Sequence, residues 1–122
     1  MILVDTSVWV DHFHKHVAAL ADILERELVV VHPFVIGELA CGNLKHRHEV
    51  LTRLAALPSA IVATDREALL LIERRNLMAK GLGYIDVHLL ASTTLGDDVQ
   101  LWTRDRRLHA VATDLRLAAA LP

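Results

Sequence analysis

Short and largely apolar runs recur along the chain at residues 2–4, 28–31, 60–63 and 100–103. Each run is continuous rather than alternating with polar positions, which is typical of strands that are covered on both faces. The segments between the runs carry apolar residues at helical spacing. We therefore predict four strands that alternate with helices in βαβ units, which gives a parallel sheet with helices on both faces.

The predicted helices begin and end at recognisable capping residues. Pro33 suits a first helical turn, Thr64 and Glu67 match a capping box, and Gly96 fits the C′ position after a last turn. No linker, repeat or low-complexity segment interrupts the pattern, so residues 1–122 are expected to form a single domain. The expected helices span residues 8–25, with room for a break near the histidine-rich stretch, and then 33–43, 47–56, 65–79 and 84–95.

Composition narrows the classes of function. Of the 122 residues, 53% are hydrophobic, which is slightly rich for a domain of this size. We therefore expect some apolar surface to be covered by a second copy of the chain, as a homodimer, or by another partner. The formal net charge of −2 provides no overall basic field for nucleic acid, and the aromatic content of 4% argues against base stacking as a main binding mode.

Cysteine usage and the start of the chain point to a cytoplasmic protein. Cys41 is the only cysteine, which excludes an intrachain disulfide and a multi-cysteine metal site, and we expect it to be buried. The first residues lack the basic segment of a secretory signal, and Asp5 comes too early for the apolar segment of one. No apolar run is long enough to span a membrane.

Two acidic residues occupy helical positions where a charge is costly. Asp86 is followed by Leu89 and Leu90 on the same face, although an acid in a first turn is also stabilised by the helix dipole. Glu38 is predicted to interrupt an apolar face in the middle of its helix, which makes it the stronger sign of a site. The same-face neighbours of Glu38 are Phe34, Val35, Cys41 and Gly42.

Two further acids follow predicted strands. Asp5 comes directly after the first strand, and Asp105 follows shortly after the fourth. Ligands of parallel sheets bind outside the carboxyl ends of the strands, and neighbouring strand ends lie about 4.8 Å apart. Each residue alone also has an ordinary explanation as a loop acid. If the first and fourth strands are neighbours, the two acids meet at one edge of the sheet.

A cluster of these four acids needs a proton or a cation, because two unit charges 4 Å apart repel by about 4 kcal/mol at an effective dielectric near 20. Oxygen-only ligands suit Mg²⁺ or Mn²⁺, which can activate water for attack on a phosphodiester. The hydroxyls of Thr6, Ser7 and Thr103 are placed to hold a metal-bound water or a phosphate oxygen. Arg104 and the arginines after Asp105 suit phosphate contacts, or are ordinary surface charge.

Four stretches of the chain, VDTSVWVDHF, VIGELACG, GYIDVHLLAS and LWTRDRRL, resemble the PIN-domain family in their order and spacing. More narrowly, they are similar to VapC-type toxins of bacterial toxin–antitoxin pairs. The resemblance covers essentially the whole chain. It implies a three-layer α/β/α sandwich with a central parallel sheet of four to five strands. It also implies a metal-dependent endoribonuclease that is inhibited by a cognate VapB-type antitoxin.

The resemblance also implies roles for individual residues. Asp5 and Asp86 match the principal ligands of Mg²⁺, for which Mn²⁺ is expected to substitute, and Glu38 and Asp105 complete the cluster through waters or a second ion. The small hydroxyl and the later threonine of the family fall on Thr6 and Thr103. Some members carry a further acid just after the one that matches Asp105. Arginines at 106 and 107 stand there instead, which weakens the case for a second strong metal site.

Other interpretations stay open at this stage. A phosphoacceptor receiver domain has similar length and fold, but it needs Asp65 as phosphoacceptor and a lysine where Arg104 stands, and it gives Glu38 no role. A binding module that kept the fold without catalysis is a second alternative, against which the presence of all four acids argues. His12 and His16 have zinc-ligand spacing, but nothing nearby completes a tetrahedral set.

Three further features carry simpler interpretations. The basic stretch at residues 45–48 is expected to be an exposed connection between helices. Its possible function is contact with an RNA backbone or with an antitoxin. Asp97 and Asp98 are predicted to form a turn at the sheet end opposite Asp5. Trp9 and Trp102 are expected in the core rather than stacked on bases.

Overall fold

The computed structural model describes residues 1–122 and contains a short parallel sheet. Its strands are β1 (Ile2–Val4), β2 (Val29–Val30) and β3 (Gln100–Trp102), in the order β2-β1-β3. In the register, Ile2 is paired with both Val29 and Gln100. Three of the four predicted strands are thus confirmed, and the first strand of the chain lies at the centre of the sheet.

The prediction of a strand at residues 60–63 is wrong, and the sheet has three strands rather than four to five. The chain touches this edge only through a single bridge between Val31 and Ser59. It then turns away, because the Ala63 amide donates to the Ser92 hydroxyl at 3.1 Å instead of to a neighbouring strand. A second single bridge, between Leu101 and Ala118, lies beside β3.

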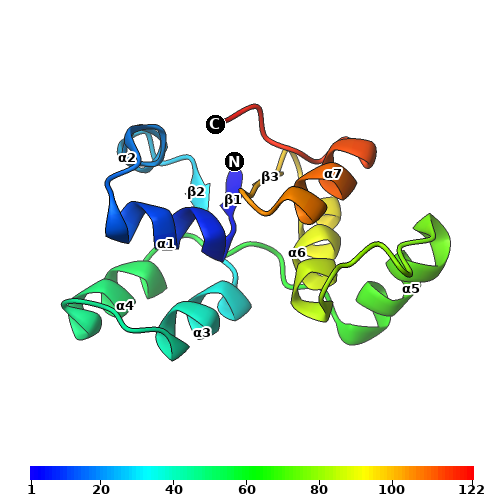
Figure 1. Ribbon diagram of the computed structural model, residues 1–122, viewed down its shortest axis with the longest axis horizontal. Helices are drawn as coiled ribbons and strands as arrows, with labels where there is room; N and C mark the ends of the chain where they lie inside the picture. The colour runs from blue at the N-terminus through cyan, green and yellow to red at the C-terminus, as the bar shows by residue number, and fades with distance from the viewer.

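Seven helices surround the sheet, and in Figure 1 α1–α4 gather on one side of the strands while α5–α7 gather on the other. The break in the first predicted helix is confirmed, whereas the helix at residues 106–114 is absent from the predictions. No helix combines the length and the apolar character that crossing a membrane requires. The helices are α1 (Thr6–His14), α2 (Ala18–Glu25), α3 (Pro33–Cys41), α4 (Arg47–Ala55), α5 (Asp65–Arg75), α6 (Tyr84–Leu95) and α7 (Arg106–Asp114).

The helix ends confirm two of the three predicted signals. Pro33 opens α3, and Thr64 and Glu67 form a reciprocal capping box at α5 with bonds of 3.1 and 2.9 Å. Gly96 follows α6 as predicted, but its φ of −82° is not left-handed. A side chain at Gly96 would instead place its Cβ 2.5 Å from Cγ2 of Val99, so close packing explains the glycine.

The core forms where the sheet meets the helices. Trp9 and Trp102 are 3% and 1% exposed, which confirms their predicted place in the core. Cys41 is exposed, so the prediction that it is buried is wrong. It is the last residue of α3, and it lies on the outer face of that helix, whereas Val35 and Leu39 are the buried residues of α3.

His32 makes stability depend on pH. It caps α3, where its Nδ1 accepts a hydrogen bond from the Phe34 amide at 3.0 Å. The pKa of His32 is lowered from 6.5 to about 4, mainly by burial and to a smaller extent by the charge of His88. The unfolded chain therefore binds a proton at a higher pH than the folded chain. As the pH falls from 6.5 to about 4, the free energy of unfolding is expected to drop by up to about 3 kcal/mol on account of His32.

Urea unfolding at about pH 7 and about pH 4.5 measures this contribution. The control is His32→Asn, because asparagine keeps a side-chain oxygen at the cap but does not titrate. The variant is expected to lose less stability than the parent protein over this interval. An equal loss in both proteins would contradict the assignment.

Candidate functional site

The carboxyl ends of β1 and β3 lie side by side and place two predicted residues next to each other. The pairing of Val4 with Trp102 brings Asp5 and Thr103 to the same edge, and the Asp5 amide donates to the Trp102 carbonyl at 2.9 Å. This confirms that the first and last predicted strands are neighbours. Asp5 and Thr103 are 6% and 5% exposed, so a carboxylate stands in a largely buried position.

Two hydroxyls fix the carboxylate of Asp5. Ser7 Oγ and Thr103 Oγ1 both donate to Asp5 Oδ2, each at 2.7 Å. The same two hydroxyls accept from the backbone, since the Arg104 amide donates to Ser7 and the Asp105 amide donates to Thr103, each at 3.0 Å. The network joins the start of α1 to the end of β3 and leaves Asp5 little freedom to rotate.

Glu38 reaches this edge from α3. Thr6, the first residue of α1, donates from Oγ1 to Glu38 Oε1 at 2.7 Å. The expectation that Glu38 interrupts a buried apolar face is wrong, because Glu38, Phe34 and Cys41 are all exposed. The helix turns its other face, with Val35, toward the core.

Asp86 lies in the first turn of α6, where its Oδ2 accepts from the Gly83 amide at 2.9 Å. Burial raises the pKa of the Asp86 carboxyl, and the charges of the other three acids raise it further, although the Gly83 hydrogen bond lowers it. This repulsion requires the acids to lie near one another. The three acids that act on Asp86 are Asp5, Asp105 and Glu38.

Asp105 caps α7, the helix that the sequence analysis did not predict. Its Oδ1 accepts from the Leu108 amide at 3.0 Å, and its side chain is exposed at the edge of the sheet. The residue thus has a structural role in starting a helix as well as a place among the acids.

The four carboxylates share one hydrogen-bonding pattern. In each, protein donors bind only one oxygen, and no protein group donates to the other. None of the four forms an ion pair with a lysine, arginine or histidine, since the ion pairs of the chain involve other acids. Arg104 pairs with Asp11 at 3.0 Å and lies over the ring of Trp102, so its guanidinium does not neutralise the cluster.

This donor set fits a hard divalent cation. All available donors are oxygens, and the negative charge has no counterpart from the protein. No three His, Cys, Asp or Glu side chains lie close enough to enclose a metal ion. An ion at this edge would be held by one or two carboxylates and by water, which is a common arrangement for Mg²⁺.

The other predicted candidates lie outside this cluster. His12 and His16 pack ring against ring, 5.2 Å apart, with no third metal ligand nearby. Asp98 has a φ of 52° in a turn and its carbonyl accepts from the amino group of Met1, so the predicted turn at the opposite end of the sheet is confirmed. Asp65 follows no strand and opens α5, which removes the basis of the receiver interpretation.

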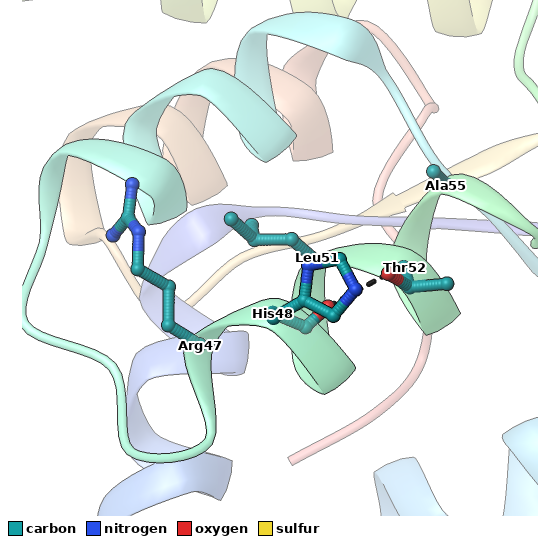
Figure 2. Close-up of a pocket in the computed structure, with 5 residues that line it drawn as sticks. All are labelled: Arg47, His48, Leu51, Thr52 and Ala55. Carbon is teal, nitrogen blue, oxygen red and sulfur yellow. Dashed lines mark hydrogen bonds between the residues drawn. The ribbon is translucent and has the colours of Figure 1, made fainter.

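A hollow on the surface does not coincide with the acids. It measures about 470 Å³, and its walls come from α4 (Figure 2). The basic stretch at residues 45–48 is exposed, as predicted. Its last two residues, Arg47 and His48, are not part of a connection but form the first turn of α4 and line this hollow. The lining residues are Arg47, His48, Leu51, Thr52 and Ala55.

Sequence reasoning missed two residues that shape the edge. Asp11 holds the Arg104 guanidinium, and nothing in the local sequence indicates that contact, because the two residues are 93 positions apart. Gly83 donates its amide to Asp86, and here a local signal exists, since an acid three residues after the N-cap can accept from the N-cap amide, which is one half of a capping box.

Comparison with known proteins agrees with this geometry. The PIN domain family model matches residues 2–114. The chain is 45% identical over 120 residues to proteins named Ribonuclease VapC32 from two strains of Mycobacterium tuberculosis, CDC 1551 / Oshkosh and ATCC 25618 / H37Rv. Each alignment covers 98% of this chain and 97% of the relative. The chain therefore belongs to the PIN domain family and is a VapC-type member of it.

Proposed function

We propose that the whole chain, residues 1–122, acts as a single PIN-like domain that cleaves RNA phosphodiesters as a divalent-metal-dependent endoribonuclease. The observation that carries this proposal is the group of four carboxylates at the sheet edge, each with one oxygen held by the protein and one left for a ligand. Likeness to relatives named as VapC ribonucleases supports RNA as the substrate.

The residues of the site divide into ligands and the groups that orient them. We propose Asp5 and Asp86 as the principal ligands of Mg²⁺, or of Mn²⁺ in its place, with Glu38 and Asp105 acting through water. The bound ion would lower the pKa of a water molecule and neutralise charge on the phosphodiester. Arginines stand at 106 and 107, just after Asp105, where some members of the family carry a further acid. The proposal therefore requires only one strongly held ion.

The neighbouring hydroxyls set the geometry of these ligands. Ser7 and Thr103 donate to one oxygen of Asp5, and Thr6 donates to one oxygen of Glu38, so the second oxygen of each carboxylate has no protein donor. The Arg104 amide holds Ser7 in place, while Asp11 directs the Arg104 side chain along α1. We propose that Thr6, Ser7, Thr103 and Arg104 position the ligands, the attacking water or the RNA in this way.

We further propose that the protein is the toxin of a toxin–antitoxin pair and that a cognate VapB-type antitoxin blocks its site. The toxin is proposed to act in the cytoplasm. A homodimer, or a larger assembly with the antitoxin, would cover the apolar side chains that the single chain leaves exposed. Leu69, Leu70 and Leu95, which are 55%, 42% and 40% exposed, form part of that surface on α5 and α6.

The first test is cleavage of single-stranded RNA by the purified protein. Activity is expected with Mg²⁺ or Mn²⁺ and is expected to disappear on chelation. Asp5→Asn and Asp86→Asn should each lower kcat by on the order of 100-fold or more, because each removes a charge from the proposed ion. The matched control is Asp97→Asn, an acid at the other end of the sheet. Undiminished cleavage by the Asp5→Asn protein would refute the site.

The second test separates orientation from ligation. Thr103→Val removes the hydroxyl that donates to Asp5 and accepts from the Asp105 amide, but it keeps the shape of the side chain. We expect kcat to fall by about 10- to 100-fold, as for other groups that orient metal ligands, and KM for RNA to change little. Thr103→Ser is the control, since it restores the hydroxyl and should restore the rate. Full activity in the valine variant would contradict the role of Thr103.

The third test concerns assembly. Light scattering at micromolar concentration is expected to give twice the chain mass of 13.6 kDa. Leu70→Lys places a charge on the exposed apolar surface of α5 and should shift the protein toward monomer, whereas Arg53→Glu on α4 should not. A monomer at all concentrations would exclude the homodimer.

A further inference from the structure

Two exposed aromatic rings lie near the acids, and the proposed reaction uses neither of them. Phe34 is 38% exposed and Tyr84 is 45% exposed. Both contact the ring of His88, with centroid distances of 4.9 Å for Phe34 and 4.7 Å for Tyr84. Because His88 is only 2% exposed, it lies beneath the two rings, and their exposed parts face away from it. Phe34 of α3 and Tyr84 of α6 thus form one aromatic surface.

This aromatic surface adjoins two of the proposed metal ligands. Phe34 lies one helical turn before Glu38 on α3, and both side chains are exposed. Residues four positions apart on a helix have Cβ atoms about 5–6 Å apart. Tyr84 is the first residue of α6, two residues before Asp86. A group bound to the two rings would therefore lie beside the acids.

The contacts of both rings hold them in place. The Tyr84 hydroxyl donates to Asp65 Oδ1 at 2.7 Å, so this side chain is fixed at its tip as well as by His88. Phe34 packs on the buried ring of His32, 5.0 Å between centroids, in addition to His88. A ring that is already ordered loses little conformational entropy when a flat ligand stacks on it, so the surface is prepared for binding.

Gly37 is a second sign of a ligand at this surface. It lies in the interior of α3, where glycine is less favourable than alanine, and its φ is not left-handed. A Cβ added there would meet no atom of the protein within 4 Å. The fold therefore does not require a glycine at this exposed position, three residues after Phe34 and next to Glu38. A glycine does allow a ligand to approach the backbone closely.

Arg107 provides a positive charge on the Tyr84 side of the surface. Its side chain lies against Gly81, three residues before Tyr84, where an added Cβ would come 2.7 Å from Cδ of Arg107. No acidic side chain forms an ion pair with Arg107. Flat apolar rings next to an unpaired cation match a nucleotide, which combines a flat base with an anionic phosphate.

An unpaired base of RNA is the ligand that fits these observations. Proteins bind single-stranded RNA by stacking its bases on aromatic side chains, whereas the bases of a duplex are stacked on one another. We propose, on the basis of the proposed function, that a base next to the cleaved phosphodiester stacks on Phe34 and Tyr84 while its nucleotide passes over Gly37. The low aromatic content of 4% is compatible with this single local site.

NMR of the intact protein tests the contact directly. Tyr84 is the only tyrosine, so labelling with ring-¹³C tyrosine gives signals from this residue alone. The probe is single-stranded oligoadenosine RNA, with Ca²⁺ in place of Mg²⁺ to limit cleavage. The Tyr84 ring signals are expected to move upfield as the RNA binds, because a stacked base shields the ring. The same RNA paired with oligouridine is the control and should leave the signals unchanged.

Fluorescence anisotropy of the labelled RNA reports binding independently of Tyr84. RNA that binds without moving the Tyr84 signals would overturn the proposal, and so would the absence of any binding. An equal shift with the duplex would also overturn it, because a duplex offers phosphates but no unpaired base.

Phe34→Leu removes a ring but keeps an apolar side chain on His88. KM for RNA is expected to rise about 10-fold, as for the loss of one base–aromatic stack, with kcat within about two-fold. Phe34→Tyr restores a ring and should restore KM. The matched control is Phe13→Leu, because Phe13 is also 38% exposed but stacks on Trp9 at the other end of α1 from Thr6. An unchanged KM in Phe34→Leu would contradict the role of Phe34.

Gly37→Leu separates a ligand role from a structural one. The fold has room for the side chain and leucine favours a helix, so the melting temperature is expected to rise by about 2–4 °C. KM for RNA is nevertheless expected to rise at least as much as in Phe34→Leu, because the new side chain fills the space beside Phe34. A more stable protein with an unchanged KM would refute the passage of RNA over Gly37.

The outcomes separate this proposal from the proposed function. If the parent protein cleaves RNA and both leucine variants on α3 keep its KM, only the base site is overturned. If the parent protein does not cleave RNA, the proposed function fails, and the Tyr84 signals still decide whether a base binds. If Phe34→Leu changes the mass in light scattering but not the affinity for RNA, the ring contacts a protein chain and the proposal is overturned.

Discussion

Leu3 and Val4 lie beside Leu101 and Trp102 in the parallel pairing of β1 with β3, and the position of the acids depends on this contact. The pairing brings Asp5 against Thr103, so one hydrogen bond joins residues 98 positions apart in the chain. Helix α1 begins directly after Asp5, and α7 begins directly after Asp105. The same pairing therefore sets the starting points of two helices and of the hydroxyls that orient the site.

Uncompensated charge is the second constraint. Four carboxylates lie near one another without an ion pair to any basic side chain. Burial raises the pKa of Asp86, and repulsion from the other three acids raises it further. Hydroxyls and amides of the protein hold one oxygen of each acid in place. An arrangement that is fixed in geometry and unsatisfied in charge is suited to a cation, because the ligands need little reorganisation when it binds.

Packing around β2 and α6 accounts for the part of the sheet that differs from expectation. Ala63 packs with Ala68, Val87 and Ala91, and its amide binds the Ser92 hydroxyl. The segment at residues 60–63 is thereby drawn toward α5 and α6 rather than along Val31. Only the two alanines of the segment, Ala60 and Ala63, are buried, whereas Ile61 and Val62 are 56% and 46% exposed. The same apolar pattern that predicts a buried strand therefore describes a half-exposed loop.

The apolar runs were sufficient to predict β1, β2 and β3 and their parallel arrangement, because strands buried on both faces need continuous apolar sequence. Local capping patterns likewise predicted the start of α5. The candidate acids could also be named from the sequence. Glu38 was singled out for an incorrect reason, however, since the helix face on which it lies is exposed rather than buried. Helix α7 went unpredicted because Asp105 was treated only as a possible ligand and not as a cap.

What the sequence alone determined is which residues are acidic and that strands carry two of them, Asp5 and Asp105, to the sheet edge, since both follow from residue type and local pattern. Only the tertiary structure decided their contacts. Asp11 with Arg104 and Thr6 with Glu38 are pairs of residues that lie far apart in the chain. Such contacts depend on how helices pack over the sheet, and that packing is set by side-chain shapes across the whole core rather than by any local pattern.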